Sequence, residues 1–429
     1  MDEEGSPAAS MRAATLSGFG QGAGPVLSVK FEPPEFDPPQ AVESRVSAST
    51  MNEERGPIPA ILGVHDTLLG HVAEESAGDP ESVPVQEMPA DFERVQEAIT
   101  PTVAWRVTLL EDGPLGSCCV HLRSRLLPMM RAARLRPPGG IDALSVDEIE
   151  VPQPGSGEAL VRVHATAITR DELDWPTDRL PAIVSYELSG VLEEVTGDAG
   201  GLAIGDEVFA LTPFDRDGVA AEHAVVPAAF LAPKPVGLSH IESAALPLAG
   251  LTAWQGLFVH GELQPTQRIL ILGAAGGVGH LATQLATWRG AHVIGTASEA
   301  AAEFARGFGA EQVLDPASPF VGSIEPVDLV FDTVGGDALA RSADVLRGGG
   351  RLVAVAEEPS PDIAARVHAT YFVVEPEREQ LVELSKLASD GVLRPAVDSV
   401  FPLEDARAAF DRVMSSGKRG KVVIEVDHA

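Results

Sequence analysis

The sequence predicts an α/β protein whose main unit is a parallel sheet with helices on both faces, preceded by a smaller β-rich unit. In the second half of the chain, strand-length apolar runs (RILILGAA, AHVIGTAS, VDLVFDTVGG, RLVAVAEE, TYFVVEP) alternate with helical stretches such as HLATQLATWRG and EAAAEFARGFG. Such alternation is typical of a doubly wound parallel sheet, because parallel strands need helical crossovers. Earlier in the chain, short segments alternate apolar and polar residues at period 2, which indicates strands that close into a small barrel.

The β-rich unit is expected to begin at Met130. Its strand candidates are 132–135, 143–149 and ALVRVHATAI, followed by LSGVLEEV, DEVFAL and AEHAVVP. The stretch from Ile241 to Gly261 then predicts a helix that Pro247 kinks or breaks, since proline lacks the N–H that a helix interior needs. Near the end of the sequence, KVVIEV is a last strand candidate, which we expect to return to the β-rich unit.

Residues 1–129 are rich in Pro, Gly, Ser and acidic residues, and we interpret them as an acidic, largely irregular extension. MRAATL at Met11 recurs as MRAARL at Met130, and PAILGV from Pro59 is similar to PAIVSY from Pro181. The extension is therefore expected to contain a truncated repeat of the start of the β-rich unit, with chance similarity as the alternative. This copy has no glycine-rich turn, so it is not a second enzyme. A protein-interaction arm is an alternative role for residues 1–129.

The composition excludes several classes of protein. With 45% hydrophobic and 22% charged residues, the 429-residue chain is typical of globular proteins, and no apolar run reaches the roughly 18 residues of a membrane helix. The formal charge of −32 would repel a phosphate backbone, so neither nucleic-acid nor membrane partners are expected. The N-terminus does not resemble a secretory signal, which favours the cytoplasm. Cys118 and Cys119 are the only cysteines, too few for a multi-thiolate zinc site or a disulfide framework.

One glycine-rich turn has the context that a dinucleotide-binding fingerprint requires. ILILGAAGGVGHLATQLA places an apolar strand directly before the turn and a helical stretch directly after it. Small residues permit the tight turn and a close approach of a pyrophosphate, and the helix N-terminus offers free N–H groups. A purely structural tight turn is the alternative. The expected cofactor-binding residues of the turn are Gly273, Ala274, Ala275, Gly276, Gly277, Val278 and Gly279, with Ala274, Gly276 and Gly279 at the fingerprint positions.

The end of the next strand candidate bears on which nicotinamide cofactor binds. Folds that prefer NAD place an acidic residue roughly 20 residues beyond the turn. Here Thr296 and Ser298 offer hydroxyl groups instead, which favours the 2′-phosphate of NADPH, whereas Glu299 directly after them favours NADH. NADPH is therefore the predicted cofactor, with NADH as the alternative.

From Met130 to its end, the chain resembles the medium-chain dehydrogenase/reductase superfamily, and within it the zinc-free quinone oxidoreductase-like group with its enoyl reductase domain. The strings that carry the resemblance are ELSGVLEEV, GDEVFAL, LAPKP, AALPLAGLTAWQGL, FDTVGG, LRGGGRLV and GKRGKVVIEV, in the family's order. It implies a GroES-like β-barrel catalytic domain over 130–250, a Rossmann NADP-binding domain over 251–391, and a return to the catalytic domain over 392–429. An active site between the two domains and a homodimer are also implied.

Zinc-dependent members of that superfamily carry a cysteine where this chain has Thr169, and a Gly-His-Glu triplet where it has Ser185, Tyr186 and Glu187. Two metal ligands are therefore missing, and no metal site is expected. The resemblance then implies zinc-independent hydride transfer from NADPH to a quinone or an α,β-unsaturated carbonyl. Thr169 and Tyr186 are the candidate catalytic residues that would hold the resulting oxyanion. A Tyr186 that packs the cleft wall is the alternative, and so is a nicotinamide-binding redox sensor or structural protein without turnover.

Further cofactor contacts follow from the same resemblance. Related sequences commonly place Lys or Arg two residues beyond the serine to hold the 2′-phosphate, and Ala300 at that position weakens the preference for NADPH. The assigned contacts are Thr252 near the nicotinamide-phosphate end, the bordering turn Thr333, Val334 and Gly335, and Lys418 and Lys421 near the phosphates.

Overall fold

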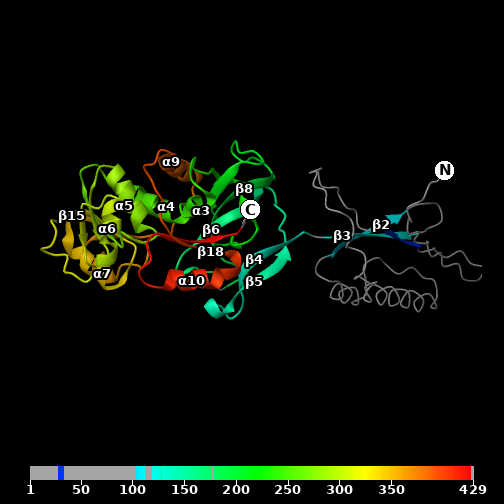
Figure 1. Ribbon diagram of the computed structural model, residues 1–429, viewed down its shortest axis with the longest axis horizontal. Coiled ribbons are helices and arrows are strands. Elements are labelled where there is room, and N and C mark those ends of the chain that lie inside the picture. The colour runs from blue at the N-terminus through cyan, green and yellow to red at the C-terminus, as the bar shows by residue number, and fades with distance from the viewer. Residues whose placement is uncertain (1–27, 33–102, 112–117, 127, 176–177, 427–429) are drawn as a thin grey trace, which may run out of the picture. The chain divides into compact units, whose positions relative to one another are not determined.

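The computed structural model of the protein describes residues 28–32, 103–111, 118–126, 128–175 and 178–426. The chain divides into two compact units, Met1–Pro128 and Met129–Ala429 (Figure 1).

The described residues of the first unit form a small sheet. Its middle strand is β3 (Cys118–Leu126), which pairs antiparallel with β2 (Val103–Glu111) and parallel with β1 (Ser28–Glu32). The segments of the expected repeat that begin at Met11 and Pro59 lie outside the described residues.

Two sheets enclose one apolar core at the start of the second unit, which is the β-barrel expected of a GroES-like domain. The larger sheet has the order β11-β9-β8-β6-β19-β18, with β10 also paired to β6, and the smaller has the order β5-β4-β7. Their core contains fully buried side chains such as Val161 and Val163, and Phe410 of helix α10 (Ala406–Met414) closes it. The strands are β4 (Met129–Leu135), β5 (Leu144–Glu150), β6 (Glu158–Ile168), β7 (Ala182–Ile183), β8 (Glu187–Val195), β9 (Glu207–Leu211), β10 (His223–Pro227), β11 (Ala232–Pro233), β18 (Val397–Pro402) and β19 (Lys421–Glu425).

The strand expected from KVVIEV is present and pairs with two strands of this barrel. It forms β19, which is antiparallel to β6 and parallel to β18. The last described strand of the chain is therefore paired, within one sheet, with a strand more than 250 residues earlier, and this pairing brings Lys421 next to the end of β6.

The second half of this unit is the predicted parallel sheet. Its order is β14-β13-β12-β15-β16-β17, so the first strand in sequence lies in the middle and the order reverses beside it. In such sheets the ligand site lies at the carboxyl ends of the strands, at this switch point. The strands are β12 (Arg268–Leu272), β13 (His292–Thr296), β14 (Gln312–Leu314), β15 (Val327–Asp332), β16 (Leu346–Ala354) and β17 (His368–Tyr371).

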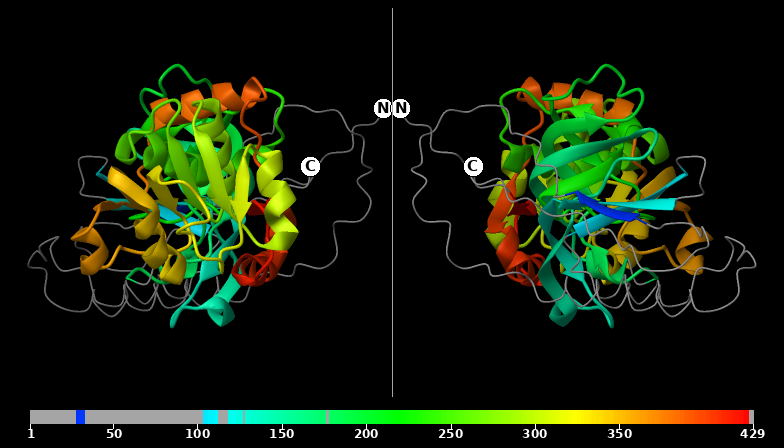
Figure 2. Two further views of the ribbon diagram at one scale, coloured as in Figure 1. Left: turned by 90° about the vertical axis from the view of Figure 1, so that its left-hand side faces the viewer. Right: turned by 90° about the vertical axis from the view of Figure 1, so that its right-hand side faces the viewer.

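Helices cover both faces of this sheet, as predicted (Figures 1 and 2). Alternate residues of β12 point to opposite faces: Ile269 and Ile271 belong to one buried cluster, and Leu270 and Leu272 to another. The first cluster includes residues of α4 (Pro247–Trp254), α5 (Gly279–Trp288), α6 (Glu299–Gly307) and α9 (Arg378–Ser389), and the second includes residues of α7 (Gly336–Ser342) and α8 (Pro361–Ala364).

Two local predictions can be compared with the structure. Pro247 breaks the predicted helix: α3 (His240–Ala244) ends before it and α4 begins at it, followed by a π-helical turn, Gln255–His260. The strand predicted from TYFVVEP is wrong over most of its length, because β17 ends at Tyr371. The apolar run continues past the sheet because Phe372 and Val374 are buried in the helical layer, not because they belong to the strand.

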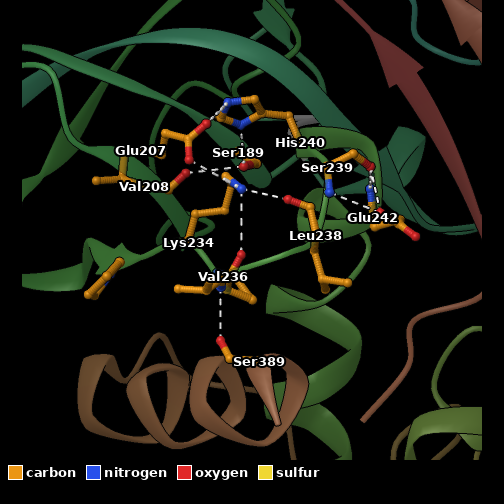
Figure 3. Close-up of polar contacts among 12 residues, drawn as sticks. Ser189, Glu207, Val208, Lys234, Val236, Leu238, Ser239, His240, Glu242 and Ser389 are labelled. Carbon is orange, nitrogen blue, oxygen red and sulfur yellow. Dashed lines mark hydrogen bonds and ion pairs between the residues drawn. The ribbon is translucent and has the colours of Figure 1, made fainter. Parts of the chain in front are cut away.

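A polar network connects the barrel with α3 and α9 (Figure 3). His240 contacts Ser189 Oγ through Nδ1 at 2.8 Å and Glu207 through Nε2 at 3.2 Å. The Val236 N–H donates to Ser389 Oγ at 2.8 Å. Burial lowers the pKa of His240 to about 4, so this imidazole is neutral at pH 7 and serves as a hydrogen-bonded structural link.

Within the described residues, no helix is both long enough and apolar enough to cross a membrane.

Candidate active site

The glycine-rich turn connects β12 to α5 at the carboxyl end of the sheet. Gly273 has φ +80°, and an added Cβ at Gly279 would lie 2.0 Å from the Gly273 carbonyl oxygen, so both positions require glycine. At Gly276 a Cβ would meet only this oxygen, at 3.3 Å, which leaves the space above the backbone open. No side chain caps the N-terminus of α5. The turn therefore fits a dinucleotide pyrophosphate, which would lie against bare backbone at a positive helix end.

Thr296 and Ser298, whose hydroxyl groups are predicted to favour the 2′-phosphate of NADPH, have different surroundings. Thr296 is buried and its Oγ1 accepts the Gly273 N–H at 2.9 Å, so this hydroxyl fixes the turn. Ser298 is exposed directly before α6 and its side chain makes no capping bond, which leaves its hydroxyl available to a ligand. Glu299 and Ala300 are exposed beside it.

The buried side chain of His280 connects the glycine-rich turn with the segment before β18 through two hydrogen bonds. The Ala396 N–H donates to His280 Nε2 at 2.9 Å, so Nδ1 carries the proton and donates to the Gly276 carbonyl, also at 2.9 Å. Burial lowers the pKa of His280 to about 4, which keeps it neutral. The Gly420 N–H also donates to the Ala275 carbonyl at 3.1 Å. The turn thus contacts the two segments that lead into β18 and β19.

Lys421 is placed differently from the prediction that it approaches the cofactor's phosphates. Its ammonium is buried and pairs with Glu187 Oε1 at 2.7 Å, while its stem lies 3.0 Å from where a Cβ of Gly277 would be. The other carboxylate oxygen of Glu187 accepts the Leu248 N–H at 2.7 Å, in the first turn of α4. Sequence strings did not show this pairing because β8, α4 and β19 meet only in the folded chain.

The Thr169 hydroxyl lies in the same network, directly after β6. Lys421 Nζ donates to Thr169 Oγ1 at 2.9 Å, and the Thr169 side chain is partly exposed. The Thr169 N–H donates to Glu172 Oε1 at 2.9 Å, and Glu172 is fully buried. Burial raises the pKa of Glu172 well above its usual range. Neither the buried Glu172 nor the ion pair of Glu187 was predicted, because both depend on neighbours that only the folded chain provides.

Tyr186 does not present its hydroxyl to solvent, so the structure favours the wall-packing alternative. The side chain is fully buried and packs against Trp175 and Phe214, with ring centroids 5.7 and 5.2 Å away. Its hydroxyl accepts a hydrogen bond from Arg179 at 3.1 Å. Burial raises its pKa, so the phenol remains protonated and the ring forms part of an aromatic wall.

The remaining predicted contacts lie in α4, directly after β15 and shortly before β19. Thr252 is buried and its hydroxyl donates within α4 to the Leu248 carbonyl at 2.6 Å. After β15, Thr333 donates to the Leu272 carbonyl at 2.7 Å, while Val334 is 55% exposed at the edge of the turn. An added Cβ at Gly273 would meet Val334 at 2.7 Å, which shows that the two turns adjoin.

Two predicted contacts complete this set. Gly335 has φ +78° and donates to the buried Asp332 carboxylate at 3.0 Å. Lys418 is partly buried, and burial together with the neighbouring Arg170 lowers its pKa. Lys418 therefore lies within electrostatic range of Arg170, which directly follows Thr169, and also of the acidic Asp398.

The donor groups at the zinc-ligand positions do not suit a metal. Thr169 Oγ1 receives an ammonium hydrogen bond, and the buried Ser185 hydroxyl donates to the Ala167 carbonyl at 2.9 Å. In the part of the chain that the structure describes, no group of three His, Cys, Asp or Glu side chains is arranged to hold a metal ion.

Comparisons with known proteins agree with this architecture. Residues 155–236 match the family model described as alcohol dehydrogenase GroES-like domain, and residues 308–424 match the one described as zinc-binding dehydrogenase. A probable zinc-binding mitochondrial oxidoreductase of Arthroderma benhamiae is 32% identical over 63% of this chain and 88% of its own length. A chloroplastic NADPH-dependent alkenal/one oxidoreductase of Arabidopsis thaliana is 31% identical over 67% and 77%. The quinone oxidoreductase structure from Coxiella burnetii is 31% identical, with a TM-score of 0.65, covering 70% of this chain and 100% of that one.

The fold, the glycine-rich turn and these relatives together define the class of protein. The chain belongs to the medium-chain dehydrogenase/reductase superfamily, in which a GroES-like domain and a Rossmann domain bind a nicotinamide cofactor. It is an oxidoreductase of that superfamily.

Proposed function

We propose that this protein uses NADPH to reduce a quinone or an α,β-unsaturated carbonyl without zinc. The observation that carries the proposal is the Lys421 ammonium at Thr169: a fixed cation and a hydroxyl lie where zinc-dependent members hold their metal. When bound, the cofactor supplies a hydride. In this proposal, the hydroxyl of the partly exposed Thr169, which accepts a hydrogen bond from Lys421, donates to the oxyanion of the acceptor.

The proposal of zinc independence rests on the same contacts. Zinc would need to displace the ammonium from Thr169 Oγ1 or bind beside it, and two adjacent cations repel strongly in a buried site. Similarity to proteins named quinone oxidoreductase and alkenal/one oxidoreductase supports the acceptor class.

The experiment is an assay of NADPH oxidation with a panel of quinones and enones. We expect turnover with at least one acceptor, unchanged by a metal chelator. Thr169→Val is expected to lower kcat about a hundredfold, because loss of one oxyanion donor typically costs on the order of 10² to 10³ in rate. A fluorescence titration that shows NADPH binding while no acceptor is reduced would support the alternative, a sensor or structural protein without turnover.

The cofactor preference can be tested at Ala300, which is exposed beside Ser298. Ala300→Arg is expected to tighten NADPH binding at least about tenfold and to leave NADH binding nearly unchanged. The physical reason is that a hydrogen bond to a charged group contributes about 1.5–3 kcal/mol. Kd values from fluorescence titration measure this, with Ala300→Gln as the uncharged control. Equal gains for both cofactors would show that the 2′-phosphate does not bind here.

A further inference from the structure

The His280 imidazole, in the first turn of α5, joins two peptide groups from distant parts of the chain. The residue is 0% exposed. Its Nδ1 donates to the Gly276 carbonyl at 2.9 Å, and its Nε2 accepts the Ala396 N–H at 2.9 Å. A neutral imidazole has one donor and one acceptor nitrogen, so both of its nitrogens are engaged. The side chain can therefore act on the site only through Gly276 and Ala396.

The bond to Gly276 sets the direction of a backbone N–H in the glycine-rich turn. A trans peptide group is planar, with its carbonyl and its N–H pointing in opposite directions. Because His280 holds the Gly276 carbonyl, the N–H of the same peptide group, which belongs to Gly277, points away from the imidazole. Within the described residues, this N–H has no hydrogen-bond partner. At a turn that fits a pyrophosphate, it is a donor for a phosphate oxygen.

The bond to Ala396 leads to the proposed oxyanion site. The Ala396 carbonyl accepts the Lys421 N–H at 2.9 Å, and Lys421 Nζ donates to Thr169 Oγ1 at 2.9 Å. The two backbone segments cross closely: a Cβ added to Gly420 would lie 2.1 Å from the Ala396 carbonyl oxygen. A continuous series of hydrogen bonds and backbone therefore connects the glycine-rich turn, through His280 and Ala396, with the Thr169 hydroxyl.

A second side chain of α5 shows what is particular to His280. Gln284, one helical turn later, also binds the segment before β18: its Oε1 accepts the Arg394 N–H at 2.9 Å, and its Nε2 donates to the Arg394 carbonyl at 3.0 Å. These two bonds involve neither the glycine-rich turn nor Lys421. Helix α5 is thus attached to this segment without His280, and His280 adds the specific connection between Gly276 and Ala396.

We infer that His280 is a positioning residue that couples occupancy of the glycine-rich turn to the placement of Lys421 and Thr169. For its effect on turnover, the inference rests on the proposed function. When the Gly277 N–H binds a phosphate oxygen, its peptide plane is fixed, and His280 carries this constraint to Ala396. Ala396 then holds the first residue of β19, Lys421, so that its ammonium stays at the Thr169 hydroxyl.

Two substitutions in the full chain separate the two bonds of His280. In His280→Asn the amide nitrogen takes the place of Nδ1, which keeps the donor to Gly276 and removes the acceptor for Ala396. In His280→Gln the amide oxygen takes the place of Nε2, which keeps that acceptor and removes the donor. Gln284→Met is the matched control, because it removes two hydrogen bonds of similar length between α5 and Arg394. Urea unfolding followed by circular dichroism confirms that each variant is folded.

Hydrogen exchange with and without NADPH is the readout that needs no turnover. In the wild type, NADPH is expected to slow exchange of the Ala396 and Lys421 amides at least about fivefold, the lower end of typical coupling between two sites. His280→Asn should lose this slowing while its NADPH Kd stays nearly unchanged, and Gln284→Met should keep it. A slowing by NADPH that persists in His280→Asn would overturn the inference.

Kinetics with a reduced acceptor give the second readout. His280→Asn is expected to lower kcat at least about tenfold, because a displacement of about 1 Å far from the chemistry can cost ~100-fold in rate. His280→Gln should instead raise the NADPH Kd about fivefold, the typical effect of one lost hydrogen bond, with a smaller change in kcat. Gln284→Met should change neither quantity.

The two His280 variants also separate positioning from a merely structural role. Equal effects of Asn and Gln on both kcat and the NADPH Kd would contradict the inference, since a histidine that only fills space does not distinguish its two nitrogens. A wild type that reduces no acceptor overturns the proposed function, while hydrogen exchange still decides whether His280 couples the turn to Lys421.

Discussion

Gly279→Ala is expected to lower the free energy of unfolding by on the order of 3 kcal/mol and to abolish NADPH binding. The new Cβ would lie 2.0 Å from the Gly273 carbonyl oxygen and 2.9 Å from the Ala274 Cα, both in the backbone of the turn. Backbone atoms cannot rotate away as a side chain does, so the turn must open and the N–H groups at the start of α5 must move. Urea unfolding followed by circular dichroism measures the stability, and fluorescence titration measures the binding.

Gly307→Ala is the matched control for this substitution. Gly307 is the last residue of α6, and an added Cβ there would meet no atom within 4 Å. Because alanine favours a helix over glycine by about 0.5–1 kcal/mol, this variant should be slightly more stable and should bind NADPH normally. If the two alanine variants had similar stability and affinity, the proposed steric role of Gly279 would be wrong.

Lys421→Met is expected to destabilise the protein by about 3–5 kcal/mol, since it leaves the Glu187 carboxylate buried without its cation. Both side chains of the pair are almost inaccessible, at 5% and 0% exposure, so water cannot replace the ammonium. The double variant Glu187→Gln/Lys421→Met removes both charges and should recover most of the loss. Free energies of unfolding in urea for the two single variants and the double variant give the coupling energy.

Lys386→Met tests the same chemical change at the surface. Lys386 pairs with Glu383 at 3.0 Å on α9, with exposed fractions of 66% and 50%. Exposed ion pairs of this kind contribute below about 1 kcal/mol, so the loss should be small. Comparable losses in the free energy of unfolding for Lys421→Met and Lys386→Met would mean that the contribution of the Lys421–Glu187 pair to stability does not depend on its burial.

Local sequence patterns predicted the arrangement of the second unit well, because they report which residues a strand or helix can bury. The run before Gly273 alternates between two apolar clusters, and Pro247 divides a helix as its missing N–H requires. Apolar character alone was misleading after Tyr371, where buried residues pack under helices although the strand has ended. Hydrophobic runs indicate burial, and they do not show which layer provides it.

By itself, the sequence predicted the glycine-rich turn from Gly273 to Gly279, since a strand, small residues and a helix in succession are typical of a βα unit that binds a dinucleotide. Together with the family resemblance, it indicated that Thr169 stands where zinc-dependent members carry a cysteine. Only the tertiary structure decided that Lys421 pairs with Glu187, that Tyr186 is enclosed, and that Glu172 lies buried beside Thr169. The physical reason is that the electrostatics of a buried group depend on its neighbours in space, and β6, β8, α4 and β19 become neighbours only through the pairing of distant strands.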